Sequence, residues 1–484
     1  MFNMIHEECG VFGIHSNNEI NVVSCVYHGL YALQHRGQES CGIAINDDGI
    51  ISGYKDVGLV SEVFTKDVLQ SLPKGNMAIG HCRYGTAGGR TPINAQPLVI
   101  RHVKGNMAIA HNGSLTNAAE LREELELTGA IFHTTSDTEV IAYTITKERL
   151  TAPSIEDAIC AAMYKIKGAY SLVIMSPKKM IAVRDPLGFR PLCIGKAGDN
   201  IVVASESCAL DTVGAEFVRD VKPGEIVVID ENGMRSIETH CNDDRKSSCV
   251  FEYIYFARPD SIIDGSCVHT ARQRAGAFLA LEHPVQADVV IGVPDSGLDA
   301  ALGYAKQSGI PYDIGFIKNK YIGRTFIEPT PLQREGILRI KLSTISSTVR
   351  DKRVILIDDS IVRGTTSKRI VKLLREAGAT EVHMRVSCPP FLHPCYFGTD
   401  IKSRDNLIAA NYSIEEITKI IGVDSLGFLS VENVSKLADN PSYDFCTACF
   451  TGNYPIPVPK DALEKKYDRK LQERKTKKET TEEK

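Results

Sequence analysis

Short apolar runs separated by turn-forming residues mark the first half of the chain. Residues 170–175, 201–204 and 226–229 are runs of this kind, and Gly, Pro and Asp lie between them. Strand-length runs with such boundaries predict antiparallel strands that stack as sheets, with few helices on the outside. We therefore expect residues 9–240 to form an α/β sandwich domain.

The second half has the pattern of a parallel sheet. Residues 354–357 form an unbroken apolar run, which suits a strand covered on both faces by helices. A helix-like segment follows, with Gly378 as its C-terminal stop, and residues 289–291 and 382–386 indicate further strands. We expect residues 249–457 to form a doubly wound α/β domain around a parallel sheet.

Polar segments bound these two regions. Residues 239–248 are polar and give the expected domain boundary. Residues 1–8 form a short polar leader, which we expect to be removed as a propeptide. From residue 460 to 484, Lys, Arg and Glu alternate almost without apolar residues, so this tail is expected to be disordered or a frayed helix.

Composition excludes several classes of protein. The chain has 484 residues, of which 43% are apolar and 24% charged, as in an ordinary globular protein. A net charge of −4 gives no electrostatic case for nucleic acid binding, and no apolar run reaches the length of about 20 residues that a membrane-spanning helix needs. Without a secretory signal we expect a soluble cytoplasmic protein, whose fourteen cysteines stay reduced.

Two acids and a small hydroxyl-rich loop follow the apolar run 354–357. Asp358 and Asp359 would lie at the carboxyl end of that strand, where open α/β sheets bind ligands. The free N–H groups at the start of the next helix, beside hydroxyl side chains, would hold a phosphate. The residues of this cradle are Arg363, Gly364, Thr365, Thr366 and Ser367. An ordinary turn after a strand is the alternative, and the paired acids disfavour it.

This stretch resembles the signature of the type I phosphoribosyltransferases, which bind 5-phosphoribosyl 1-pyrophosphate (PRPP). The resemblance implies that the acids lie against the ribose hydroxyls and Mg²⁺, and that the loop takes the 5-phosphate. Ser296, which follows another strand beside Asp295, is a third candidate for the metal site. Lys318, Arg324 and Lys341 belong to a basic stretch that is either a solvated loop or a lid over pyrophosphate.

Cys9 opens a Gly-rich apolar strand, and most cysteines in that position are simply buried thiols. The leader changes the interpretation, because its removal would give Cys9 a free α-amino group. An α-amine has a pKa of about 8 and can act as a base beside the nucleophile that it carries. Cys9 is therefore a candidate N-terminal nucleophile.

Five segments support this hypothesis by resemblance to class II glutamine amidotransferases, and the resemblance implies an αββα sandwich of the N-terminal nucleophile hydrolase type. The segments are residues 9–13, 33–38, 80–86, 111–113 and 136–139, and they occur in that family's order and approximate spacing.

The resemblance also implies roles for individual residues. Arg83 would bind the α-carboxylate of glutamine and Asp137 its α-ammonium group, a charge-assisted pairing. The Asn112 side chain and the Gly113 N–H would form the oxyanion hole. Arg36 and Thr86 would line the same pocket. Taken singly, these residues also fit a surface Arg, a turn or a helix cap.

Four further cysteines, Cys249, Cys395, Cys446 and Cys449, need another explanation. The pair Cys446 and Cys449 is a single C-x-x-C, which is a moderate signal for metal on its own. By resemblance, all four match the ligands of a [4Fe–4S] centre in the cluster-containing glutamine PRPP amidotransferases. Members of that family without these cysteines carry no cluster.

The resemblance to glutamine PRPP amidotransferases covers residues 8–457 and implies two half-reactions. Cys9 would release ammonia from glutamine, and the ammonia would displace pyrophosphate from C1 of PRPP to give 5-phosphoribosylamine for purine synthesis. It also implies feedback inhibition by purine nucleotides and a homotetramer. Two alternatives stay open: an amidotransferase with another acceptor, and a PRPP-sensing regulator with a phosphoribosyltransferase fold.

Overall fold

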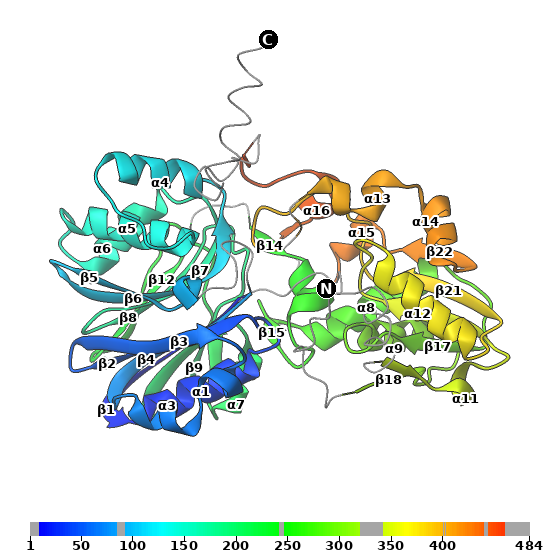
Figure 1. The fold of residues 1–484 in the computed structure, drawn as a ribbon, viewed down its shortest axis with the longest axis horizontal. Coiled ribbons are helices and arrows are strands. Elements are labelled where there is room, and N and C mark those ends of the chain that lie inside the picture. Colours follow the sequence, from blue (N-terminus) through cyan, green and yellow to red (C-terminus); the bar gives the residue numbers. More distant parts are fainter. Residues whose placement is uncertain are drawn as a thin grey trace, which may run out of the picture.

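Two lobes lie side by side in the computed structural model (Figure 1). The structure describes residues 9–84, 92–241, 246–319, 342–399, 401, 403–439 and 444–459. The leader 1–8 and the tail 460–484 fall outside these ranges. Within the described residues, no helix is long and apolar enough to cross a membrane.

The first lobe contains two stacked antiparallel sheets. One sheet has the strand order β11-β9-β10-β1-β4-β2-β3 and the other has the order β13-β12-β8-β7-β6-β5. The strands of the first sheet are β1 (Gly10–Ile20), β2 (Ser40–Asp47), β3 (Ile50–Val57), β4 (Gly75–Arg83), β9 (Cys193–Ala197), β10 (Asn200–Ala204) and β11 (Glu216–Asp220). Those of the second are β5 (Leu98–His102), β6 (Gly105–Leu115), β7 (Gly168–Met175), β8 (Met180–Arg184), β12 (Ile226–Asp230) and β13 (Gly233–Ile237).

Helices cover both outer faces of this lobe. The helices are α1 (Val22–Ala32), α2 (Val60–Val63), α3 (Lys66–Ser71), α4 (Ala118–Leu127), α5 (Asp137–Arg149), α6 (Ile155–Met163) and α7 (Ser207–Thr212), with the 3₁₀ turn η1 (Pro92–Asn94). Helices α1 and α7 pack on the first sheet and α4, α5 and α6 on the second. The predicted αββα sandwich is confirmed, with more helical cover than the apolar runs indicated.

Alternation along the strands builds the layers. On β4, Met77 and Ile79 point between the sheets, whereas Ala78 and Cys82 point toward α1. Both faces are buried, so these strands read in the sequence as nearly continuous apolar runs. Successive side chains of a strand point to opposite faces, so only alternate residues at a strand end point into the layer between the two sheets.

The second lobe is built on a parallel sheet of order β17-β20-β21-β22. Its strands are β17 (Val289–Gly292), β20 (Arg353–Asp358), β21 (Glu381–Val386) and β22 (Ser425–Phe428). The main helices are α8 (Val268–Glu282), α9 (Gly297–Ser308), α12 (Thr365–Glu376) and α14 (Ile414–Ile421). Gly378 follows α12 at φ +99°. The doubly wound fold and the predicted strands are confirmed.

Short elements complete this lobe. They are β14 (Ser247–Cys249), the π-helical turn η2 (Glu252–Phe256), β15 (Ile262–Ile263), β16 (Ser266–Cys267), β18 (Phe316–Lys318), β19 (Leu342–Thr344), α11 (Ser346–Val349), η3 (Arg404–Asn406), α13 (Ile408–Asn411), α15 (Val431–Val434), β23 (Asp444–Cys446) and α16 (Ala448–Thr451). The strands β14 and β23 pair in parallel, so the end of the described chain returns to the start of the lobe.

Buried charges join the two lobes. Arg184, at the end of β8, is 1% exposed and donates to both carboxylate oxygens of Asp264 at 2.7 and 2.9 Å. Asp264 lies between β15 and β16, so this hairpin of the second lobe is fixed to the first. A bidentate arginine–carboxylate pair sets both distance and orientation.

Close packing of α8 on α9 gives a test of the second lobe. A Cβ added at Gly276 would lie 1.8 Å from the carbonyl oxygen of Ala300. Gly276→Ala should therefore separate the helices and destabilise the lobe by about 1–3 kcal/mol, which thermal unfolding would detect as a lower Tm. Thr270→Ala, at an exposed position on the same helix, should leave the Tm unchanged or slightly higher. Equal Tm values for the two variants would contradict this packing.

Candidate functional site

Cys9 lies immediately before β1, the central strand of the first sheet. Its thiol is 3.8 Å from the carbonyl oxygen of Tyr84, which follows β4. The next residue, Gly10, pairs with Cys82. The thiol is partly buried, so this strand end can present a nucleophile without full exposure to water.

Strands from both sheets meet beside Cys9. Val11 pairs with His81 on β4, and the His81 ring contacts the carbonyl oxygen of His111 on β6 at 3.0 Å. Asn112 therefore comes from the facing sheet to the same end of the sandwich. Its side chain is fully buried, and neither its oxygen nor its nitrogen has a hydrogen-bond partner among the described residues.

Gly113 occupies a position that only glycine can take. Its φ is +140°, and an added Cβ would lie 2.1 Å from the carbonyl oxygen of Ala169 on the neighbouring strand. A buried amide without a partner costs about 1–3 kcal/mol. Asn112 and Gly113 together thus resemble a prepared site for a polar ligand rather than ordinary core.

Asp137 and Arg83 provide charges of opposite sign. Burial alone would raise the pKa of Asp137, but His111 and the N–H groups of Leu115 and Thr138 outweigh it and lower that pKa. Leu115 N–H donates to the carboxylate at 3.0 Å. Arg83, the last residue of β4, is 5% exposed and lies 3.9 Å from the Glu39 carboxylate.

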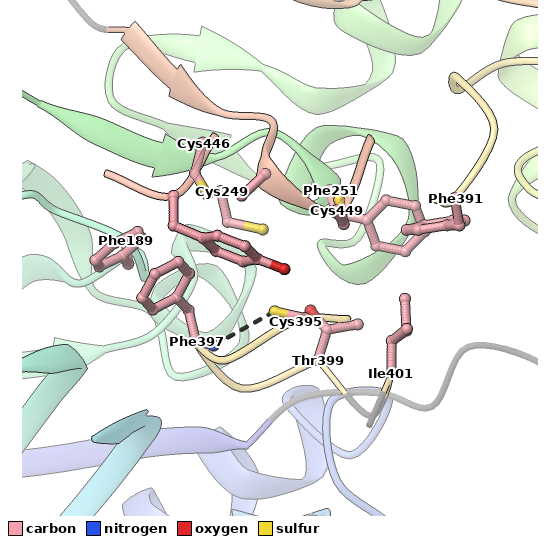
Figure 2. Close-up of a pocket in the computed structure, with 12 residues that line it drawn as sticks. Phe189, Cys249, Phe251, Phe391, Cys395, Phe397, Thr399, Ile401, Cys446 and Cys449 are labelled. Atoms are coloured by element: carbon pink, nitrogen blue, oxygen red, sulfur yellow. Dashed lines mark hydrogen bonds between the residues drawn. The ribbon is translucent and has the colours of Figure 1, made fainter. Parts of the chain in front are cut away.

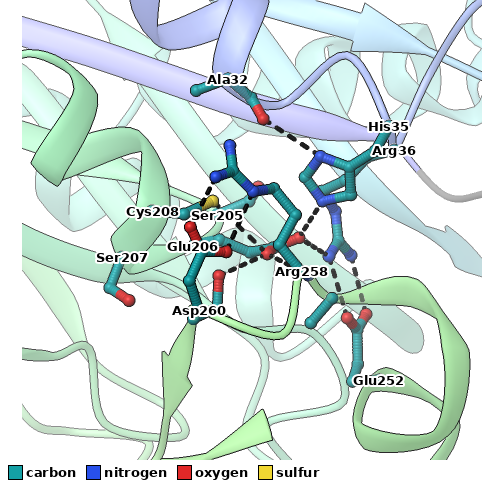
Figure 3. A network of polar contacts seen from close by, with 12 residues as sticks. Ala32, His35, Arg36, Ser205, Glu206, Ser207, Cys208, Glu252, Arg258 and Asp260 are labelled. Carbon is teal, nitrogen blue, oxygen red and sulfur yellow. Dashed lines mark hydrogen bonds and ion pairs between the residues drawn. The ribbon is translucent and has the colours of Figure 1, made fainter. Parts of the chain in front are cut away.

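The structure places Arg36 differently from the predicted ligand-facing position. Its side chain is fully buried, and its Nε donates to the carbonyl oxygen of Cys9 at 3.0 Å. The remaining nitrogens donate to Glu206 at 2.5 Å and to Glu252 at 2.8 and 2.9 Å (Figure 3). The guanidinium is thus engaged by protein groups from both lobes. Thr86, the other predicted lining residue, lies outside the described residues.

The paired acids of the second lobe lie at the carboxyl end of β20. Asp358 and Asp359 are 7% and 5% exposed. Ser296, at the start of α9, and Ser360 both donate hydroxyl hydrogen bonds to Asp359. Burial and the adjacent carboxylate hold the pKa of Asp358 well above its ordinary range, and burial also raises the pKa of Asp359. Two buried acids with raised pKa values at the end of a strand mark a candidate functional site.

A pocket of about 490 Å³, open to solvent, contains these acids. Gly364, with a φ of +74°, immediately precedes α12 and makes no side-chain cap, so the first N–H groups of that helix can hold an anion. The pocket is lined by the predicted residues Ser296, Asp358, Asp359, Arg363, Gly364, Thr366 and Ser367. Thr365 is the first residue of α12 and is not among the lining residues.

The predicted basic stretch is only partly described. Lys318 ends β18 and forms an ion pair with Asp295, which lies three residues after the end of β17. Arg324 and Lys341 lie outside the described residues. Tyr255 also lines the pocket and is not among the residues predicted from the sequence. Its only signal is its place in an aromatic run at the start of the second lobe, which no local chemistry distinguishes.

The four predicted cysteines line one cavity of about 410 Å³ (Figure 2). Cys249 and Cys446 lie opposite each other on the neighbouring strands β14 and β23, Cys449 lies on α16, and Cys395 lies in a loop. Most of the remaining lining side chains are aromatic, including Phe189, Phe251, Phe391, Phe397 and Tyr454.

Two thiols of this cavity, those of Cys446 and Cys449, are held in the protonated form by burial. Burial raises the pKa of Cys446 to about 12 and that of Cys449 well above its ordinary value. Phe397 N–H donates to the Cys395 sulfur at 3.4 Å. Across the described ranges, no three His, Cys, Asp or Glu side chains lie close enough together to hold a metal ion.

Comparisons with known proteins agree with this arrangement. A family model for the glutamine amidotransferase domain matches residues 86–212, and one for the phosphoribosyl transferase domain matches residues 273–402. Amidophosphoribosyltransferase from Methanocaldococcus jannaschii is 50% identical over 464 residues, which are 93% of this chain and 98% of that protein. Its counterpart from Bacillus subtilis is also 50% identical, with 95% and 96% covered.

A solved structure is similar over nearly the whole chain. Glutamine PRPP amidotransferase from B. subtilis, complexed with ADP and GMP, superposes with a TM-score of 0.87 at 49% identity. The match covers 94% of this chain and 98% of that one. Sequence identity over nearly the whole chain and the shared fold therefore agree, and the chain belongs to the amidophosphoribosyltransferase family of enzymes.

Proposed function

We propose that this protein releases ammonia from glutamine at Cys9 and transfers it to C1 of PRPP, giving 5-phosphoribosylamine and pyrophosphate, the first step of purine synthesis. The observation that carries the proposal is that one chain holds two complementary sites. A cysteine beside the unpartnered amide of Asn112 lies in one lobe, and a pocket with paired acids and a phosphate cradle lies in the other.

In the first half-reaction, the Cys9 sulfur bonds to the amide carbon of glutamine. The α-amine, which becomes free once residues 1–8 are removed, takes the thiol proton and passes it to the leaving nitrogen. The carbon–nitrogen bond then breaks to give a thioester and ammonia. Asn112 Nδ2 and the Gly113 N–H stabilise the oxyanion, and water then releases glutamate and regenerates the thiol.

Charge pairing holds the amino-acid part of glutamine in this proposal. Arg83 binds the α-carboxylate and Asp137, which its surroundings keep ionised, binds the α-ammonium group. Thr86 contributes to the same pocket. Arg36 acts indirectly, because its guanidinium is occupied by the two glutamates and by the Cys9 carbonyl.

In the second half-reaction, ammonia forms a bond to C1 of PRPP while the bond from C1 to the pyrophosphate oxygen breaks. The cradle of residues 363–367 holds the 5-phosphate, and Asp358 and Asp359 hold the ribose hydroxyls. Lys318, Arg324 and Lys341 bind the pyrophosphate. Ser296, Asp358 and Asp359 form an oxygen-rich donor set that fits Mg²⁺; when bound, the ion would offset negative charge on the leaving group.

The cavity of four cysteines fits a [4Fe–4S] cluster. Cys249, Cys395, Cys446 and Cys449 would each supply one thiolate to an iron of the cluster, and support comes from their lining a single cavity. Buried thiols with raised pKa values are deprotonated only when a metal compensates. Since none of the four is in either pocket, the proposed role is structural.

Further parts of the proposal concern organisation and regulation. We assign residues 9–240 to the glutaminase domain and 249–457 to the phosphoribosyltransferase domain. Purine nucleotides act as feedback inhibitors, and support comes from the B. subtilis relative that was solved with ADP and GMP. The proposed assembly is a homotetramer.

Replacing Cys9 tests the division into two sites. Cys9→Ala should abolish glutamine-dependent synthesis of 5-phosphoribosylamine and leave synthesis from added ammonia intact, because only the first site loses its nucleophile. Cys25→Ala, at another partly buried cysteine of the same lobe, should keep both activities. Retention of glutamine-dependent synthesis by Cys9→Ala would contradict the nucleophile assignment, and loss of both activities would contradict the separation of sites.

Replacing Asn112 tests the oxyanion hole. Asn112→Ala should lower kcat for glutamine hydrolysis by about 10²–10³ with ammonia-dependent synthesis unchanged. Asn46→Ala is the matched control, since Asn46 is also a buried strand asparagine but is hydrogen-bonded to Asn76 and to the Pro177 carbonyl. A kcat equal to that of the parent enzyme would show that Asn112 does not contact the transition state.

Iron analysis tests the cluster. Protein purified without oxygen should be brown and contain about four iron atoms per chain, and Cys446→Ser should lower the iron content because one ligand is lost. Cys267→Ser, a half-exposed cysteine outside the cavity, should keep its iron. A folded, colourless and iron-free preparation of the parent protein would refute the assignment.

A further inference from the structure

Glu252 of the second lobe is hydrogen-bonded to Arg36, whose guanidinium binds the backbone of Cys9. Glu252, the first residue of η2, is 2% exposed. Its two oxygens accept from Arg36 at 2.8 and 2.9 Å, and one of them also accepts from Arg190 at 3.2 Å. Arg36 in turn donates to the Cys9 carbonyl at 3.0 Å. The Arg36 guanidinium therefore connects Glu252 to the nucleophile's own backbone.

Charge balance explains why Arg36 keeps this orientation. Arg36 and Arg190 are both fully buried, and both pair with Glu252. Arg36 also pairs with the buried Glu206 (Figure 3). Glu206 also accepts from the Arg258 N–H at 2.9 Å. Glu206 and Glu252, from different lobes, bind the terminal nitrogens of the Arg36 guanidinium. This orientation directs the Nε–H toward the carbonyl oxygen of Cys9. Loss of either carboxylate would leave a buried positive charge unbalanced.

The position of Glu252 is itself fixed by the second lobe. Arg272, 4% exposed on α8, donates to the carbonyl oxygens of Tyr253 at 2.9 Å and Ala257 at 2.7 Å. These contacts hold both ends of η2. Tyr255 in the middle of the same turn lines the pocket of the paired acids. The π-helical turn η2 thus provides Tyr255 to the pocket of the paired acids and Glu252 to the ion pair with Arg36.

Arg190, the second arginine that binds Glu252, connects it to the cavity of four cysteines. Arg190 donates to the Phe397 carbonyl oxygen at 2.8 and 3.3 Å, and Phe397 N–H donates to the Cys395 sulfur. Phe397 also stacks on Phe189, with ring centres 4.3 Å apart. Glu252 therefore lies between the support of the nucleophile and the wall of the four-cysteine cavity.

We propose that Glu252 is a positioning residue for glutamine hydrolysis, which acts through Arg36 to hold the Cys9 carbonyl and so aims the nucleophile of one lobe from the other. The proposal rests on the proposed function of Cys9. Glu252 does not line the pocket of the paired acids, and its carboxylate binds Arg36 and Arg190. Its loss should therefore displace the attacking sulfur without removing a contact to glutamine. Displacement of a reacting group by about 1 Å is enough to lower a rate by up to 10²-fold.

The Arg184–Asp264 pair provides a matched control. It is also a buried, bidentate arginine–carboxylate pair between the lobes. The contacts of the Arg184 guanidinium are with Asp264 and with backbone carbonyls of the first lobe, and Cys9 is not among them. A substitution in this pair loosens the interface in a similar way but leaves the support of Cys9 in place.

The experiment compares Glu252→Gln with Asp264→Asn in the full-length enzyme. For Glu252→Gln we expect kcat for glutamine-dependent synthesis to fall about tenfold, with the KM for glutamine within about twofold and ammonia-dependent synthesis unchanged. The rate at which iodoacetamide alkylates Cys9, followed by mass spectrometry of its peptide across pH, should also change. Asp264→Asn should retain the parent ratio of glutamine-dependent to ammonia-dependent rates and the parent alkylation profile.

Two results would overturn the proposal: a parent-like ratio and alkylation profile in Glu252→Gln, or an equal fall in Asp264→Asn. If Glu252→Gln loses ammonia-dependent synthesis as well, Glu252→Asp replaces it, because this variant keeps the charge and withdraws the carboxylate by one methylene. A parent-like ratio in Glu252→Asp would again overturn the proposal. Failure of the Cys9 assignment is distinguishable, since Cys9→Ala would then keep its glutamine-dependent activity.

Discussion

A set of buried charges at the contact between the lobes is the constraint on which the first site depends. Arg36 and Arg190 are matched by Glu206 and Glu252, and all four side chains are almost completely excluded from water. Burying such charges is costly, and removing one partner costs about 3–5 kcal/mol because it leaves the other uncompensated. The set therefore fixes the relation between the lobes more strictly than apolar packing would.

The two proposed sites contain polar groups that are unfavourable without a ligand. Asn112 is fully buried with an unbonded amide, and Asp358 and Asp359 are adjacent acids in a pocket that raises their pKa values. Each arrangement lowers stability in the absence of a ligand. A transition-state oxyanion in the first site and a cation with a ribose phosphate in the second would satisfy them.

Local patterns predicted much of the fold and part of the sites. The run 354–357 and the loop after it predicted a strand, a helix start and a pocket, since all of these depend on neighbours in sequence. The role of Arg36 could not be predicted, because its partner Glu252 is 216 residues away. Tyr255 was missed for a similar reason: an aromatic side chain in an apolar run does not reveal which surface it lines.

Passage of nitrogen from glutamine in one lobe to PRPP in the other is the central step proposed for this enzyme. The direct measurement is to supply glutamine labelled with ¹⁵N in its amide, together with PRPP, Mg²⁺ and unlabelled ammonium, and to follow the label into 5-phosphoribosylamine. We expect a product that carries mainly ¹⁵N. Glutamine hydrolysis without labelled product, or product nitrogen drawn mainly from ammonium, would contradict it.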